Sequence, residues 1–188
     1  MKQNNTFVYW DFFFYESWRL MVAATNKGLC YVSPTQSFVD LDKWVSSRLP
    51  NARLIHDKLL VKPFTFQFKE YFQGRRKEFD FPIDIYGSPF QRLVWETLYN
   101  IPYGHMKSYS DVAEHLQKLN SFRAVGAAIG ANPVLIAIPC HRVVGKDGRL
   151  TGYRGGLEMK QQLLQLEKNS RNIEKTMGEP STSERIPL

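Results

Sequence analysis

The sequence contains little cysteine and no long run of apolar residues. Two cysteines, Cys30 and Cys140, cannot form the disulfide framework of a small secreted domain. The most apolar run, residues 134–138, lies between two prolines and is far shorter than the roughly 20 residues of a membrane-spanning helix. The first residues lack the apolar centre of a signal peptide. We therefore expect a protein of the reducing cytoplasm without a membrane segment.

Metal ligands are also few. The four histidines and two cysteines are scattered, whereas a structural zinc site takes about four such ligands in paired spacing. We therefore expect no metal. Aromatic residues are abundant instead: the chain has 13 Phe, 9 Tyr and 4 Trp, and each such ring can bury on the order of 150 to 250 Å². The chain can therefore build a core of its own.

The chain carries a net positive charge. Lys and Arg total 25 against 18 for Asp and Glu, a net charge of +7 that is spread over both halves of the sequence. A basic surface favours a polyanionic partner such as nucleic acid, but it also occurs on proteins that are simply soluble. The charge alone does not choose between the two.

Residues 1–86 alternate between strand-like and helical patterns. Apolar or alternating runs predict strands, and apolar residues at helical spacing predict two helices between them. The predicted strands cover residues 6–10, 18–23, 29–32 and 79–86, and the predicted helices cover residues 39–49 and 64–72. This mixture predicts an α+β fold.

The sequence changes character at Gly87, which indicates a domain boundary near residue 86. Ser88 can cap a helix that has Pro89 at its first position. Further on, Ser108 and Asp111 match a capping box at the start of a short helix. We expect Ser121 to cap a second short helix, so that the two form a helix-turn-helix.

The rest of the chain contains a loop, a helix and a tail. Five glycines among basic residues predict a wing-like loop over residues 145–156, followed by a helix over residues 157–167. Residues 169–188 lack hydrophobic periodicity, and we expect them to be disordered.

Cys140 is the candidate nucleophile. Its neighbours His141 and Arg142 can supply the cationic surroundings that lower the pKa of a thiol, whereas Cys30 lies in an apolar run typical of a core. Adjacent residues of an extended segment point to opposite sides, so His141 needs a turn or a bridging water to act on Cys140. The carboxylates that could orient this histidine are Asp111, Asp147, Glu158 and Glu167, and spacing does not select one.

The second short helix is unusual for a helix that reads DNA. Reading the major groove requires long polar side chains, but this helix offers mainly Gly and Ala. Small residues permit close approach to a narrow minor groove, with Arg123 as the one long side chain able to enter a base stack. Tight packing of the helix within the protein would explain the small residues equally well.

Seven motifs occur together in a fixed order over residues 87–168. They are Pro89-Phe90-Gln91, Ile101-Pro102-Tyr103-Gly104, Ser108-Tyr109, Arg123-Ala124-Val125-Gly126, Asn132-Pro133, Pro139-Cys140-His141-Arg142-Val143 and Gly152-Tyr153-Arg154-Gly155-Gly156. In this combination the chain resembles the O6-alkylguanine-DNA alkyltransferase family. The resemblance implies an α+β fold with a small ribonuclease-H-like amino-terminal domain (1–86), a mostly helical winged helix-turn-helix alkyltransferase domain (87–168) and a tail (169–188).

The resemblance also implies a role for individual residues around the thiol. Cys140 matches the acceptor that takes the alkyl group irreversibly, His141 the residue that deprotonates it through a water, and Glu167 the carboxylate that orients this histidine. Asn132 matches a residue that braces the recognition helix against the active-site segment. Tyr109 matches the tyrosine that donates a proton toward the departing guanine while contacting the DNA backbone.

Other matched residues would bind the substrate and the DNA. Tyr153 would line the alkyl pocket beside Leu135, where many members carry a proline; the backbone N–H of Arg154 would face the alkylated oxygen, and the carbonyl of Val143 the guanine amino group. Arg123 would replace the flipped nucleotide in the duplex. The small residues that would lie against the DNA are Ala124, Gly126, Ala127 and Gly130.

The function implied is direct repair of double-stranded DNA that carries O6-alkylguanine or O4-alkylthymine. The protein would act once, as a monomer, without a cofactor, in the cytoplasm and at the nucleoid if the source is bacterial. A non-catalytic alkyltransferase-like binder of damaged DNA is the alternative, but such relatives carry Trp or another residue in place of Cys140. A cysteine hydrolase would need a histidine separated from the thiol.

Overall fold

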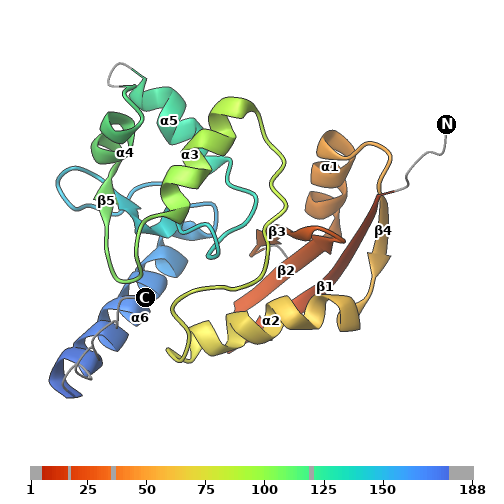
Figure 1. The fold of residues 1–188 in the computed structure, drawn as a ribbon, viewed down its shortest axis with the longest axis horizontal. Helices are drawn as coiled ribbons and strands as arrows, with labels where there is room; N and C mark the ends of the chain where they lie inside the picture. The colour runs from red at the N-terminus through yellow and green to blue at the C-terminus, as the bar shows by residue number, and fades with distance from the viewer. Residues whose placement is uncertain (1–5, 17, 35–36, 119–120, 178–188) are drawn as a thin grey trace, which may run out of the picture.

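The computed structural model describes residues 6–16, 18–34, 37–118 and 121–177. Its amino-terminal part is a four-stranded sheet with the strand order β3-β2-β1-β4. The strands are β1 (Phe7–Tyr15), β2 (Trp18–Thr25), β3 (Gly28–Ser33) and β4 (Arg53–His56). The first three pair antiparallel, and β4 pairs parallel to β1. Figure 1 shows this sheet beside a second, mostly helical part, which confirms the predicted α+β fold.

Two helices cover the two faces of the sheet. Helix α1 (Phe38–Arg48) packs Leu41 and Val45 against Val8, while α2 (Lys58–Phe72) packs Phe68 on the opposite face, against Phe13. Residues 8 and 13 of β1 can serve different faces because successive side chains of a strand alternate. The sheet is therefore buried on both sides, and the side covered by α2 shares one hydrophobic core with the carboxyl-terminal part.

The predicted strand over residues 79–86 is wrong. Among these residues Ile83 makes one isolated bridge, to Leu29, and Pro82 has no N–H for a ladder. Phe79 and Phe81 pack their rings on Phe68 instead. Phe79 and Phe81 therefore cover α2, Tyr86 packs on Trp44 of α1, and the segment does not extend the sheet as a strand.

Two elements of the amino-terminal part differ from prediction in other ways. The short strand β4 was not predicted, because most of its residues are exposed and it has no clear alternation. Helix α2 begins at Lys58 rather than near residue 64, since the Asp57 carboxylate accepts from the N–H groups of Leu59 and Leu60 and the helix accommodates Pro63.

The carboxyl-terminal part begins with α3 (Pro89–Tyr99). It continues through β5 (Lys107–Ser108), α4 (Tyr109–His115), α5 (Phe122–Gly130), the short 3₁₀ turn η1 (Cys140–Arg142), β6 (Val143–Val144) and α6 (Gly156–Met177). The predicted caps at Ser88 and Ser108 are confirmed, and each forms a complete capping box. Ser121 makes no side-chain cap, because its backbone is not extended as a capping residue requires.

Helix α6 runs past the predicted end at residue 167. It continues to Met177, so the expected disorder is wrong for residues 169–177. No glycine or proline interrupts residues 168–177, and Gly178 follows directly. The remaining residues of the expected tail, 178–188, lie outside the described part of the chain.

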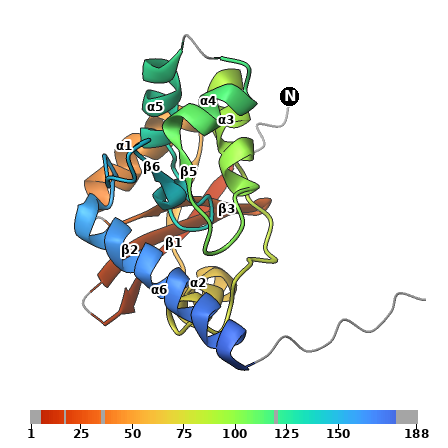
Figure 2. The same ribbon diagram turned by 90° about the vertical axis from the view of Figure 1, so that its left-hand side faces the viewer.

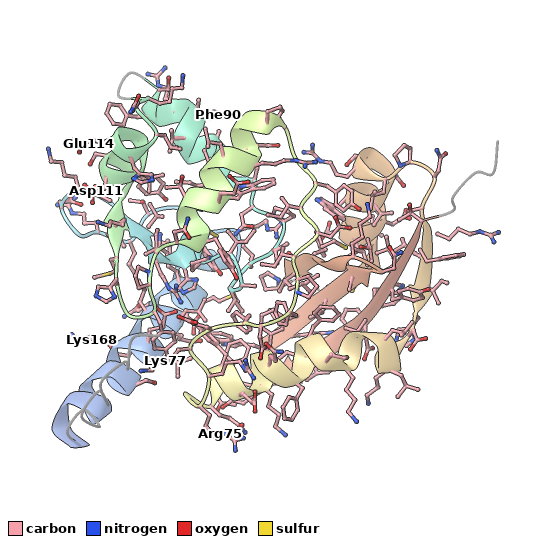
Figure 3. The ribbon with its side chains drawn as sticks, viewed as in Figure 1. Arg75, Lys77, Phe90, Asp111, Glu114 and Lys168 are labelled. Carbon is pink, nitrogen blue, oxygen red and sulfur yellow. The ribbon has the colours of Figure 1, made fainter. Side chains whose placement is uncertain are left out.

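The long helix α6 crosses beside the end of α2 (Figure 2). Arg75 and Lys77 lie in the segment after α2 and Lys168 lies on α6, whereas Asp111 and Glu114 lie on α4, away from the sheet (Figure 3). Within the described ranges, no helix is both long and apolar enough to cross a membrane.

Candidate active site

The thiol of Cys140 lies at the start of the 3₁₀ turn and is 4% exposed. The side chain of Asn132, two residues beyond α5, donates from Nδ2 to the carbonyl of Ile138 (2.8 Å) and to Sγ of Cys140 (3.1 Å). Its Oδ1 accepts from the N–H of Val134 at 2.9 Å. Asn132 therefore ties the end of α5 to the segment that carries the thiol.

His141 is fully buried and turns toward α6. Its Nε2 lies 2.9 Å from Oε1 of Glu167. A carboxylate only accepts, so Nε2 carries the proton and Nδ1 keeps a free lone pair. Nδ1 is buried and has no hydrogen-bond partner among the described residues. The imidazole therefore has one ring nitrogen available as a base.

Glu167 is the one of the four candidate carboxylates that the structure brings to His141. Arg142 donates to both carboxylate oxygens from Nε (3.1 and 3.0 Å) and to Oε1 from Nη2 (2.8 Å). The N–H of Gly104 donates to Oε2 at 2.9 Å, and the hydroxyl of Tyr71 donates to Oε1 at 2.6 Å. Burial raises the pKa of Glu167, but the hydrogen bonds and charges of His141 and Arg142 outweigh it and hold that pKa far below its usual value.

The thiol is protonated at rest. Burial raises the pKa of Cys140, and the Asn132 amide and the charges of Arg154 and Lys160 offset this only in part. His141 and Arg142, which were expected to supply the cationic surroundings of the thiol, face Glu167 instead and are not among the groups that lower its pKa. Burial also lowers the pKa of His141, so the imidazole is neutral and can accept a proton.

Two buried side chains at this site were not predicted from the sequence. Lys160 is fully buried and donates from Nζ to the carbonyls of Val143 (2.5 Å) and Thr151 (2.7 Å). Its spacing of seven residues from Glu167 places both on one face of α6, which is a signal the sequence contained. Tyr71 contacts Glu167 although the two residues are 96 positions apart in the sequence, and no local sequence pattern points to Tyr71.

The residues expected to line the substrate pocket lie around the thiol segment. The ring of Tyr153 lies edge-on to that of His141, with centroids 6.4 Å apart. Val143 and Leu135 are buried. Arg154 donates from Nη2 to the carbonyls of Val32 (2.9 Å) and Pro133 (3.3 Å), so its side chain reaches the amino-terminal sheet.

Helix α5 exposes a surface of small residues. Arg123, Ala124 and Ala127 are exposed, whereas Val125, Ala128 and Ile129 face the core. A Cβ atom added at Gly126 or Gly130 would meet nothing within 4 Å. Packing inside the protein therefore does not require glycine at these two positions.

Tyr109 lies at the first position of α4, beside the glycine-rich loop. Its hydroxyl lies 3.5 Å from the carbonyl of Gly152, and its ring centroid lies 6.0 Å from Nζ of Lys160. The half-buried Tyr109 therefore joins the start of α4 to the glycine-rich loop. Over the described ranges, no three His, Cys, Asp or Glu side chains are grouped so that they could hold a metal ion.

Comparisons with known proteins match both parts of the chain. Residues 89–169 match the 6-O-methylguanine DNA methyltransferase DNA-binding domain, and residues 8–85 match the ribonuclease-like domain of the same family. A methylated-DNA–protein-cysteine methyltransferase of Bacillus subtilis, described as inducible, is 46% identical over 171 residues, which cover 90% of this chain and 96% of that protein.

Solved structures agree with these matches. The O6-methylguanine methyltransferase of Mycobacterium tuberculosis superposes with a TM-score of 0.74 at 32% identity, over 90% of this chain and 98% of that one. Mycobacterium tuberculosis OGT in complex with DNA superposes with a TM-score of 0.72 at 33% identity, over 87% and 94% of the two chains. Two domain matches that together span most of the sequence, and a relative of nearly the same extent, place this chain in the 6-O-methylguanine DNA methyltransferase family.

Proposed function

We propose that this protein repairs alkylated DNA by transferring the alkyl group from O6 of guanine to Sγ of Cys140. The observation that carries the proposal is the buried Cys140 thiol, held by Asn132, next to a His141–Glu167 pair whose remaining ring nitrogen is free to act as a base. The relatives named above are methyltransferases that act on methylated DNA and a protein cysteine.

The transfer is a single displacement at carbon. The proton of Cys140 passes through a water to Nδ1 of His141, and Glu167 stabilises the imidazolium that forms. The thiolate then forms a bond to the alkyl carbon while the bond between this carbon and O6 breaks. The electron pair of the broken bond goes to the guanine. Tyr109 supplies a proton, so neutral guanine leaves. The thioether on Cys140 is stable, so each molecule reacts once and no cofactor is consumed.

The helix-turn-helix gives the reacting atom access to the thiol. O6 of guanine lies inside the base stack, so the nucleotide must be rotated out at a cost of a few kcal/mol. Arg123 would fill the gap in the duplex, while Ala124, Gly126, Ala127 and Gly130 let α5 lie close to the minor groove. Their exposure and the open space over the two glycines support this role.

The flipped base would enter beside Tyr153 and Leu135, with the N–H of Arg154 on the alkylated oxygen and the carbonyl of Val143 on the amino group. We propose O6-alkylguanine and O4-alkylthymine in duplex DNA as the substrates and a monomer in the cytoplasm as the active form. We also propose a domain boundary near residue 86. The two family matches, which end at residue 85 and begin at residue 89, support this boundary.

Mass spectrometry of the protein after mixing with alkylated duplex DNA tests the proposal. We expect one stable alkyl adduct on Cys140 and none in Cys140→Ala. The matched control Cys30→Ala should give the parent result, because Cys30 is buried in the core between the sheet and α1. Bound but unaltered DNA with no adduct would favour the non-catalytic binder. Repair of more than one equivalent of DNA per protein molecule, without a lasting adduct, would favour a hydrolase.

A further inference from the structure

The amino-terminal domain reaches into the proposed acceptor site through Tyr71. This residue lies in the last turn of α2, is fully buried, and donates its hydroxyl to Oε1 of Glu167 at 2.6 Å. The same hydroxyl oxygen lies 3.5 Å from Nε2 of His141. One side chain of the ribonuclease-like domain thus contacts both members of the histidine–carboxylate pair.

The Tyr71 hydroxyl keeps its proton. Burial raises its pKa well above the usual value, and the neighbouring Glu167 carboxylate raises it further. The ring is fixed between Tyr103, whose centroid lies 5.9 Å away, and Phe79, at 5.5 Å. The hydroxyl is therefore a permanent donor in a fixed place.

Glu167 does not need Tyr71 to stay in position. The guanidinium of Arg142 and the N–H of Gly104 already bind both of its oxygens. What the hydroxyl adds is electrostatic. Its hydrogen favours the ionised form of Glu167, and its oxygen, the negative end of the O–H dipole, faces the Nε2–H group of His141. Both effects favour a proton on Nε2 and stabilise the imidazolium.

We propose that the ribonuclease-like domain completes the alkyl-acceptor site, with Tyr71 as a positioning residue that fixes the His141 tautomer and supports the thiolate–imidazolium pair through Glu167. The inference rests on the proposed alkyl transfer. It gives the amino-terminal domain a part in the chemistry that is separate from any contact with DNA.

The test uses the full chain and a free O6-alkylguanine base, so that DNA binding and nucleotide flipping do not contribute. In Tyr71→Phe, we expect the apparent pKa of the Cys140–His141 pair in the rate profile to rise by about 0.5 to 1 pH unit. Transfer below that pKa should slow about three- to tenfold, and the rates should converge above it, where the thiolate forms without help.

Tyr15→Phe is the matched control. Its hydroxyl donates to the carbonyl of Phe72, the residue after Tyr71, and does not touch the site. It should keep the parent profile. A change that only loosened α2 would lower the rate at every pH in both variants, whereas the proposed role moves the profile of Tyr71→Phe alone.

A double-mutant cycle gives a second, independent test. If Tyr71 acts mainly through Glu167, removing its hydroxyl in a Glu167→Gln background should shift the apparent pKa by less than it does in the parent, because only the direct contact with His141 remains. An unshifted profile in Tyr71→Phe, or a full additional shift in the double variant, would overturn the inference. If the parent itself forms no adduct on Cys140, the proposed function fails, which is a distinct result.

Discussion

Burial has opposite effects on the neighbouring groups of Cys140 and His141. It raises the pKa of the thiol and lowers the pKa of the imidazole, so both are neutral at rest near pH 7. An ion pair between them forms only when the reaction requires the thiolate. A neutral resting thiol is protected from side reactions with oxidants. That protection suits a protein that uses its nucleophile once.

The low pKa of Glu167 in the folded protein predicts how the free energy of unfolding changes with pH. Its pKa is depressed in the folded protein, so its contribution to stability is fully present above its unfolded-state pKa and is lost as the pH falls below that value. Removing one member of a buried ion pair costs about 3 to 5 kcal/mol. We expect Glu167→Gln to lower the free energy of unfolding by about that much at pH 7.

Urea denaturation at pH 7 and near pH 4 measures this difference. The gap between the parent and Glu167→Gln should narrow at the acid end, because Glu167 takes up a proton there in the unfolded parent while it stays ionised in the folded one, and the variant has no carboxyl group at this position. Glu158→Gln on the exposed side of α6 is the control and should stay close to the parent at both pH values. A gap that widens toward acid would contradict the depressed pKa.

Local sequence signals predicted some parts of this site and missed others. The nucleophile and its histidine follow from adjacent residues, and Lys160 and Glu167 share one helical face, so both could have been placed on the buried side of α6. Tyr71 and the tether of Arg154 to Val32 could not, because each joins segments about a hundred residues apart. Such contacts depend on how the two domains pack together.

Helices and strands likewise follow from the sequence where local signals determine them, and not where contacts between distant segments do. The ends of α3 and α4 follow from Ser88 and Ser108, whose caps are local hydrogen bonds. Residues 79–86 read as a strand by their apolar pattern, but their side chains pack on both helices instead: Phe79 and Phe81 on α2, and Tyr86 on α1. A local pattern predicts an element correctly where local bonds determine it, and fails where a distant surface does.

A substitution in α5 can separate the stability of the protein from its binding to DNA. Gly126→Ala places a methyl group where nothing lies within 4 Å, and alanine stabilises a helix interior by about 0.5 to 1 kcal/mol relative to glycine. We expect thermal unfolding at the parent temperature or higher, but weaker binding to duplex DNA, because the methyl group lies between α5 and the groove. Titration of labelled duplex would measure the loss. Equal DNA affinity in the variant would argue against α5 as the contact helix.

Arg123 at the start of α5 gives the sharper test of nucleotide flipping. Arg123→Ala should slow repair of duplex DNA strongly, while a free alkylguanine base, which needs no flipping, should react with Cys140 at nearly the parent rate. Lysine should restore activity only in part, because it lacks the planar guanidinium that stacks on bases. Single-turnover rates at saturating DNA check this.

Arg48→Ala, in the last turn of α1, is the control for a lost surface charge. A simple phosphate-binding arginine would weaken duplex binding without changing the saturated rate. Repair of saturating duplex by Arg123→Ala at the parent rate would therefore exclude the flipping role, and so would equal losses on duplex and free base.

The active-site segment and the amino-terminal sheet form one continuous structure. The N–H of Val32 in β3 donates to the carbonyl of Pro133 at 2.8 Å, and the N–H of Leu135 donates back to the carbonyl of Val32 at 3.3 Å. Arg154 adds a side-chain bond to the same two carbonyls from the loop that would hold the alkylated oxygen. The sheet edge therefore supports the wall of the pocket as well as the segment before the thiol.

This link gives Arg154 two separable effects, one of charge and one of geometry. The charge of Arg154 lowers the pKa of Cys140 in opposition to burial, and its hydrogen bonds tie the loop to β3. Arg154→Gln should therefore raise the apparent pKa for transfer to a free base and also lower the free energy of unfolding by about 1 to 3 kcal/mol. Arg154→Lys keeps the charge, so it should hold the pKa near that of the parent while losing part of the stability.

Arg149→Gln, whose parent side chain is exposed and paired with Asp147, should change neither the apparent pKa nor the free energy of unfolding. If the glutamine and lysine variants shift the rate profile equally, charge is not the cause, and Arg154 acts on the thiol only by fixing the loop to the sheet.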